Sequence, residues 1–135
     1  MQQKTYTELY ALITALAGVG AFTPDEQVNI LNFVNRRLFE AYQTSQMWPR
    51  YLVVGEQRTI GSNQTIPYSE ATLGDIAEFI RIHRKQPFLR NSAMEFNFYV
   101  DSVGAHIINL STSDSTSAFV TYKKTCPLMT TASVD

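Results

Sequence analysis

Hydrophobic residues near the start of the chain recur every three or four positions, which is the spacing of one face of a helix. This first stripe consists of Leu9, Leu12, Ile13 and Leu16. It predicts a short amphipathic helix over residues 6–17. Gly18 follows the stripe directly, at the position where a glycine commonly ends a helix.

A second and longer stripe runs from residue 24 to about residue 45. Its members are Val28, Leu31, Val34 or Asn35, Leu38 and Tyr42, with Ile30 and Phe33 widening it on one flank. The stripe predicts a second helix that is more deeply packed than the first. Arg36 and Glu40 fall outside the stripe four residues apart, which predicts an ion pair on the helix surface.

Each predicted helix begins with a capping box. In this motif a threonine oxygen accepts a hydrogen bond from the third helical N–H, and a glutamate reaches back to the threonine N–H. The pairs are Thr5 with Glu8 and Thr23 with Glu26. The linker of residues 18–22 is short, so the two helices should form a hairpin or a corner.

The pattern changes after Trp48, because Pro49 disfavours a helical conformation and short β-rich runs follow it. Residues 51–54 and 57–60 flank a Gly-Glu pair, which predicts either two paired strands or one bulged strand. Residues 78–83 alternate between polar and apolar. This alternation predicts a strand with Phe79 and Arg81 on the face opposite Ile80 and Ile82.

The last third of the chain predicts a hairpin and one further strand. Residues 96–100 and 106–110 are rich in aromatic and β-branched side chains and flank a turn composition. Residues 118–124 predict another strand, which Pro127 ends. A polar tail then runs to residue 135, and Leu128 and Met129 are its large apolar side chains.

Together these patterns predict an α+β fold. We expect an N-terminal helical hairpin followed by a small, mainly antiparallel β-sheet or sandwich, with an extended C-terminal tail. The 135 residues are expected to form a single domain, with a helical part at 1–47, a β part at 48–125 and the tail at 126–135.

Composition excludes several classes of protein. No apolar run approaches the roughly 18 residues that a membrane-spanning helix needs, so no membrane partner is expected. The formal net charge is −1, which excludes the strongly basic class of dedicated nucleic-acid binders. The single Cys126 cannot form an internal disulfide, which favours a reducing compartment, and the N-terminus lacks the features of a signal peptide.

A local basic strip lies between residues 79 and 94, where the chain carries four cations and no acid. They are Arg81, Arg84, Lys85 and Arg90. Such cations commonly protect a strand edge from aggregation, and we favour this interpretation over contact with phosphates. Nearby aromatics could form a base-stacking platform, but core packing is the favoured role for Phe96, Phe98, Tyr99, Phe119 and Tyr122.

Signals for catalysis are weak. The two histidines, His83 and His106, have no ligand motif around them, and Cys126 is distant in sequence. The chain has no Gly-x-Ser-x-Gly elbow and no phosphate-binding glycine loop. The sequence therefore predicts a protein that is not an enzyme and has no cofactor and no metal.

Three segments carry a resemblance to a known family. Residues 5–9 (Thr-Tyr-Thr-Glu-Leu) open the first helix, residues 32–38 (Asn-Phe-Val-Asn-Arg-Arg-Leu) lie in the second, and residues 120–128 (Val-Thr-Tyr-Lys-Lys-Thr-Cys-Pro-Leu) end the sheet. In this order of parts the chain resembles the head-to-tail connector, or adaptor, proteins of tailed bacteriophages. The resemblance covers most of the chain.

The resemblance implies a virion structural protein. Such a protein forms a ring beneath the portal, expected to be a dodecamer, extends the DNA channel and provides the attachment surface for the tail or the next neck protein. Its place would be the neck of the virion, and the host cytoplasm during assembly. Two other classes stay open: a small nucleic-acid-binding module that uses the basic strip with aromatics, and an enzyme subunit completed by another chain.

The resemblance also implies roles for particular residues. Cations facing the channel would contact the packaged DNA without reading its sequence. The candidates are Arg81, Arg84, Lys85 and Arg90, with Arg36 and Arg37 as alternatives. Pro127, Leu128 and Met129 are the candidates for contact with the portal or a neighbouring subunit.

Overall fold

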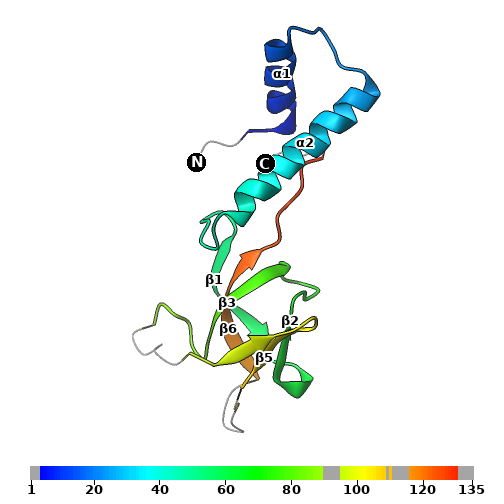
Figure 1. The fold of residues 1–135 in the computed structure, drawn as a ribbon. Helices are drawn as coiled ribbons and strands as arrows, with labels where there is room; N and C mark the ends of the chain where they lie inside the picture. The colour runs from blue at the N-terminus through cyan, green and yellow to red at the C-terminus, as the bar shows by residue number, and fades with distance from the viewer. Residues whose placement is uncertain (1–3, 90–94, 109, 111–115, 131–135) are drawn as a thin grey trace. The chain divides into compact units, whose positions relative to one another are not determined.

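The computed structural model describes residues 4–89, 95–108, 110 and 116–130 (Figure 1). Two N-terminal helices are followed by two small antiparallel sheets of three strands each, so the predicted α+β fold is confirmed. The chain divides into two compact units. The helical unit comprises Met1–Thr44 and Pro127–Asp135, and the β unit comprises Ser45–Cys126.

Helices α1 (Tyr6–Ala17) and α2 (Pro24–Gln43) begin where the sequence predicts, and α2 ends slightly before the predicted end near residue 45. Both capping boxes form: the Thr5 side chain accepts from the Glu8 N–H at 3.2 Å, and the Thr23 N–H donates to Glu26 Oε2 at 2.8 Å. The backbone hydrogen bond from Thr23 lowers the pKa of Glu26. Gly18 ends α1 with a φ of 69°, a left-handed conformation that suits glycine.

The interior of the helical unit is small. Its buried hydrophobic residues, among those described, are Tyr6, Tyr42 and Met129. The edge of the Phe22 ring packs on Tyr10 with the ring centroids 5.9 Å apart. The expectation that α2 is the more deeply packed helix was wrong, because one residue is buried on each helix.

The first sheet has the strand order β1 (Leu52–Thr59), β6 (Ser117–Lys124) and β3 (Ile76–His83), all antiparallel. β1 is one bulged strand, which settles the alternative left open by the sequence. Its register against β6 shifts between Val53 and Glu56, and Gly55 has a φ of 67° at this bulge.

A bulge in β3 changes which of its side chains lie on the same face of the sheet. The register against β6 shifts between Phe79 and Arg81, so Ile80 interrupts the alternation. Phe79 and Ile82 are therefore both buried in the core, and Arg81 is exposed. The prediction that Phe79 lies opposite Ile82 was wrong, because the pairing with β6 adds a residue that the sequence pattern does not reveal.

The second sheet has the order β2 (Thr65–Pro67), β5 (Gly104–Ile107) and β4 (Phe98–Val100). β4 and β5 form the predicted hairpin, but β4 is shorter than expected and β5 begins at Gly104, earlier than the predicted start at residue 106. A 3-10 turn, η1 (Ser62–Gln64), precedes β2, which the sequence did not predict as a strand.

Both sheets contribute to one hydrophobic core. Its buried members are Ile60, Ile66, Ile76, Phe79, Ile82, Phe96, Ala105, Ile107, Ala118, Val120 and Tyr122. The β unit is therefore a small sandwich with the apolar faces of its strands turned inward.

Gly104 permits the pairing of β5 with β2. A Cβ atom at this position would lie 2.1 Å from the carbonyl oxygen of Ile66, which belongs to the backbone and cannot move aside. Gly104→Ala should therefore lower the free energy of unfolding of the β unit by at least about 2 kcal/mol. Urea denaturation followed by fluorescence measures this change.

Gly61→Ala is the matched control, because its added Cβ would make only an ordinary contact, 3.4 Å from the carbonyl oxygen of Thr65. Its midpoint should shift little. Equal stability of the Gly104→Ala and wild-type proteins would contradict the close approach of β2 and β5.

Candidate interaction surface

The basic strip is partly neutralised within the chain. Arg81 is exposed and pairs with Glu95 at 3.3 Å, and the Arg84 guanidinium lies over the Phe96 ring at 4.9 Å from its centroid. Lys85 is exposed. Arg90 lies outside the described residues. An acid that follows the strip in sequence thus reduces the positive charge that the strip offers to a partner.

The two histidines occupy different places in the β unit. His83 is buried at the end of β3, with its Nε2 3.3 Å from Glu95 Oε1. His106 on β5 pairs through Nε2 with Asp101 Oδ2 at 2.7 Å. Within the described ranges, no cluster of three histidine, cysteine or acidic residues could hold a metal ion.

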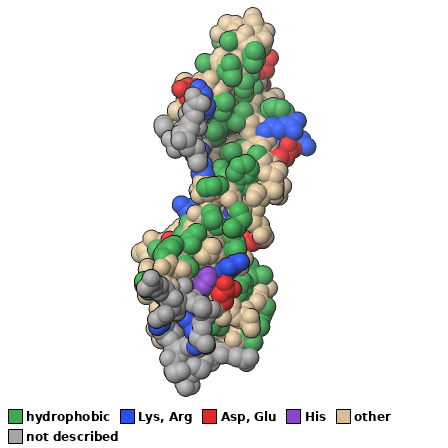
Figure 2. All heavy atoms as spheres, turned by 90° about the vertical axis from the view of Figure 1, so that its left-hand side faces the viewer, with side chains coloured by type: hydrophobic (Ala, Val, Ile, Leu, Met, Phe, Trp, Pro, Cys, Tyr) green, Lys and Arg blue, Asp and Glu red, His purple; other side chains and the backbone are tan. Residues whose placement is uncertain are grey.

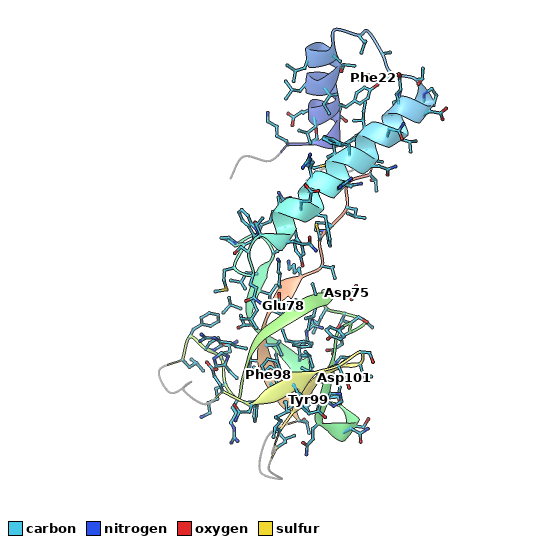
Figure 3. The ribbon with its side chains drawn as sticks, viewed as in Figure 1. Phe22, Asp75, Glu78, Phe98, Tyr99 and Asp101 are labelled. Carbon is cyan, nitrogen blue, oxygen red and sulfur yellow. The ribbon has the colours of Figure 1, made fainter. Side chains whose placement is uncertain are left out.

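Thr65, His106 and Asp101 form a hydrogen-bonded row that resembles a catalytic relay. Thr65 Oγ1 lies 2.9 Å from His106 Nδ1, and the Tyr99 ring stacks on the imidazole with centroids 4.9 Å apart. Figure 3 labels Tyr99 on β4 and Asp101, the residue that follows this strand. Thr65 is buried, however, and the Asp101 carboxylate also accepts the Val103 N–H, which lowers the pKa of Asp101. The row orders the β4–β5 hairpin and presents no open nucleophile.

The aromatic residues of the strands do not form a base-stacking platform. Phe96 and Tyr122 are buried in the core, and Phe98 packs against it. Phe119 is half-buried, and Tyr99 is exposed but stacked on His106. Core packing is thus the role of most of these side chains, as the sequence favoured.

A buried ion network was missed by the sequence analysis. The Arg58 side chain on β1 is fully buried, and its Nη2 lies 2.7 Å from Glu56 Oε1. The same Nη2 donates to the Tyr122 hydroxyl at 3.0 Å and to the carbonyl of Gly74. Burial raises the pKa of Tyr122, and its hydrogen bond to Glu56 adds to the shift. The Arg58 guanidinium is thus held inside the chain, and the Glu56 side chain remains partly exposed.

The arginines of α2 are both paired with one acid. Arg36 Nε lies 3.3 Å from Glu40 Oε1, as the spacing predicted, and Arg37 Nη1 lies 2.8 Å from Glu40 Oε2. The Arg37 hydrogen bond is the largest cause of the lowered pKa of Glu40. Arg37 also lies over the Phe33 ring. All three charged groups are exposed, so these pairs add little stability.

The Asn35 side chain attaches the C-terminal tail to α2. The Asn35 amide donates to the Met129 carbonyl at 3.0 Å and accepts from the Met129 N–H at 2.7 Å. Met129 is buried, whereas Pro127 and Leu128 are exposed. Of the three residues predicted to contact a partner, Met129 thus packs within its own chain.

Large apolar side chains are exposed over both units, and Figure 2 shows them spread over the face that it draws. On the helical unit they include Leu12, Leu16, Val19, Val28, Phe33, Phe39 and Leu128. On the β unit they include Met47, Trp48, Val54, Phe88, Leu89, Tyr99, Val100, Val103 and Ile108. A contiguous apolar patch marks a site of interaction with another protein or a membrane, whereas singly scattered apolar side chains are ordinary. None of the described helices is both long enough and apolar enough to cross a bilayer.

No family model, curated protein or solved structure matches this chain. Its function is therefore argued from these surfaces and from the resemblance of its sequence to the connector proteins.

Proposed function

We propose that this protein is a head-to-tail connector of a tailed bacteriophage. Copies of the chain assemble as a ring under the portal, extend the DNA channel and provide the surface to which the tail attaches. The protein is a structural component of the virion neck and not an enzyme.

The exposed apolar stripe of α1 is the observation that carries this proposal. Leu12 and Leu16 lie one helical turn apart and are 57% and 79% exposed. Covering one leucine side chain contributes about 1.5–3 kcal/mol, so a helix that leaves two of them in water is suited to a subunit contact. A ring of identical subunits supplies such a cover at every copy.

The cations have a role in the same proposal. Arg36, Arg37, Arg81, Arg84 and Lys85 are candidates to line the channel, where they contact phosphates without reading sequence. Arg90 remains a candidate from the sequence alone. Glu40 and Glu95 partly neutralise the arginines that they pair with. This suits a channel through which DNA must move, because weak contacts with the phosphates do not hold the DNA in place.

Leu128 is proposed as the tail's contact with the portal. The attachment of Met129 to Asn35 holds the tail next to α2 and leaves Leu128 59% exposed. Deletion of residues 127–135 would also remove the buried Met129, so a point variant is the sharper test. Leu128→Glu changes an exposed side chain and should leave the fold intact.

The experiment is co-purification with the portal protein encoded in the same genome. Wild-type chain should elute with the tagged portal, and Leu128→Glu should bind it at least tenfold more weakly. Thr130→Glu, an exposed position two residues away, is the matched control and should bind as wild type. Absence of wild-type binding at micromolar concentrations of both proteins would overturn the proposed function.

A further inference from the structure

The helical unit contains a small open pocket between α1 and the start of α2. Tyr6, Thr7, Tyr10 and Gln27 line it, and its volume is about 170 Å³. A cavity of about 150 Å³ with apolar walls is large enough to hold benzene. The pocket therefore has room for one aromatic ring, and the neighbouring rings of Tyr6 and Tyr10 offer it an aromatic wall.

Tyr6 adds a second observation. The side chain is more than nine-tenths buried, and its hydroxyl has no hydrogen-bond partner in the described parts of the chain. A buried hydroxyl without a partner is costly. Because the hydroxyl oxygen is itself buried, an occupant with an acceptor would remove this cost only where the Tyr6 side chain shifts toward it.

The β unit carries a side chain of matching size. Phe88, in the loop after β3, is 70% exposed. The loop is packed on the bulge of β1: a Cβ added to Gly55 would lie 2.7 Å from Pro87 and 3.5 Å from the Phe88 ring. Because Pro87 and Phe88 already lie against the sheet, little ordering of these two residues is needed when Phe88 binds.

The charges around Phe88 and around the pocket favour a second copy of this chain as the occupant. The loop carries Arg84 and Lys85 just before Phe88. Residues 4–35, which contain the pocket, carry Glu8, Asp25 and Glu26 against the single cation Lys4. The basic loop of one chain thus complements the acidic end of the helical unit of another.

We propose that copies of this chain join head to tail, with Phe88 of one copy seated in the Tyr6–Tyr10 pocket of the next. This inference rests on the proposed function for the closure of the ring, but the contact itself does not require a portal. The two surfaces are different patches of one chain, so the contact is heterologous and repeats from copy to copy.

The test uses the full chain and two variants that block opposite sides of the contact. Phe88→Ser removes the ring, and Thr7→Trp fills the pocket from an exposed position on α1. Native mass spectrometry over a concentration series should show oligomers for the wild type. Each variant alone should be monomeric, with self-association at least tenfold weaker. Gln86→Ser, which changes an exposed polar side chain two residues before Phe88, should assemble as wild type.

Mixing the two variants gives the decisive result. Phe88 of the Thr7→Trp chain can enter the open pocket of the Phe88→Ser chain, so an equimolar mixture should form heterodimers and nothing larger. Variants that still form wild-type oligomers, a mixture that stays monomeric, or a wild type that never self-associates on its own would overturn the contact. Self-association through Phe88 without portal binding would support the contact and reject the connector role. Portal binding by chains that do not contact one another through Phe88 would support the connector role and reject the contact.

Discussion

Replacement of Leu12 and Leu16 by lysine together is expected to abolish assembly of the chain on the portal while both helices stay folded. The two side chains are exposed in the isolated chain, so the monomer loses little when they change. In the proposed ring they would be covered, and each leucine would then contribute up to about 1.5–3 kcal/mol. Loss of both should weaken each subunit contact by at least a hundredfold, which co-sedimentation with the portal measures.

A second double variant controls for the added charge. Ala11 and Ala15 are also exposed on α1 and are also four residues apart, but they lie outside the leucine stripe. Ala11→Lys with Ala15→Lys introduces the same two charges and should assemble normally. Circular dichroism should show equal helix content for all three proteins. Normal assembly of the Leu12→Lys, Leu16→Lys variant would show that the stripe is not a subunit contact.

Replacement of Arg58 by alanine is expected to destabilise the β unit by about 3 kcal/mol, because it removes one partner from a buried ion network. The Glu56 carboxylate and the Tyr122 hydroxyl would then lose the guanidinium that lies 2.7 Å and 3.0 Å from them. The free energy of unfolding in urea measures the loss.

A second substitution separates the unpaired charge from the lost packing. Arg58→Met keeps most of the buried volume, and Glu56→Leu removes the carboxylate that loses its contact with the guanidinium. The double variant should recover more than half of the stability that Arg58→Ala loses. If Arg58→Ala unfolds at the same urea concentration as wild type, the network does not stabilise the sheet.

The parts of the fold that depend on local chemistry were predictable from the sequence. Thr5 with Glu8 and Thr23 with Glu26 fix the starts of both helices through bonds that span three residues, so the pattern alone reveals them. The β4–β5 hairpin was predictable for the same reason, because its turn lies between two strand-like runs.

Features that depend on distant pairing were not predictable. The bulge at Ile80 arises from the register between β3 and β6, and the docking of Met129 depends on Asn35, 94 positions away. Arg58 was missed because a cation in an alternating strand is ordinarily exposed. One signal was present, since Glu56 and Arg58 carry opposite charges two residues apart and thus tend to share a face.

The surface residues illustrate a further limit. Leu12 and Leu16 belong to the stripe that predicted α1, but the pattern does not say whether the stripe is covered by the same chain or by another. Phe88 carried no signal in the sequence, because its exposure depends on how Pro87 packs against Gly55.

Single-particle electron microscopy of the portal mixed with an excess of this protein tests the central claim most directly. The account predicts an added ring of about a dozen copies below the portal, coaxial with its channel. Portal particles that carry no added density at saturating protein concentration would contradict it.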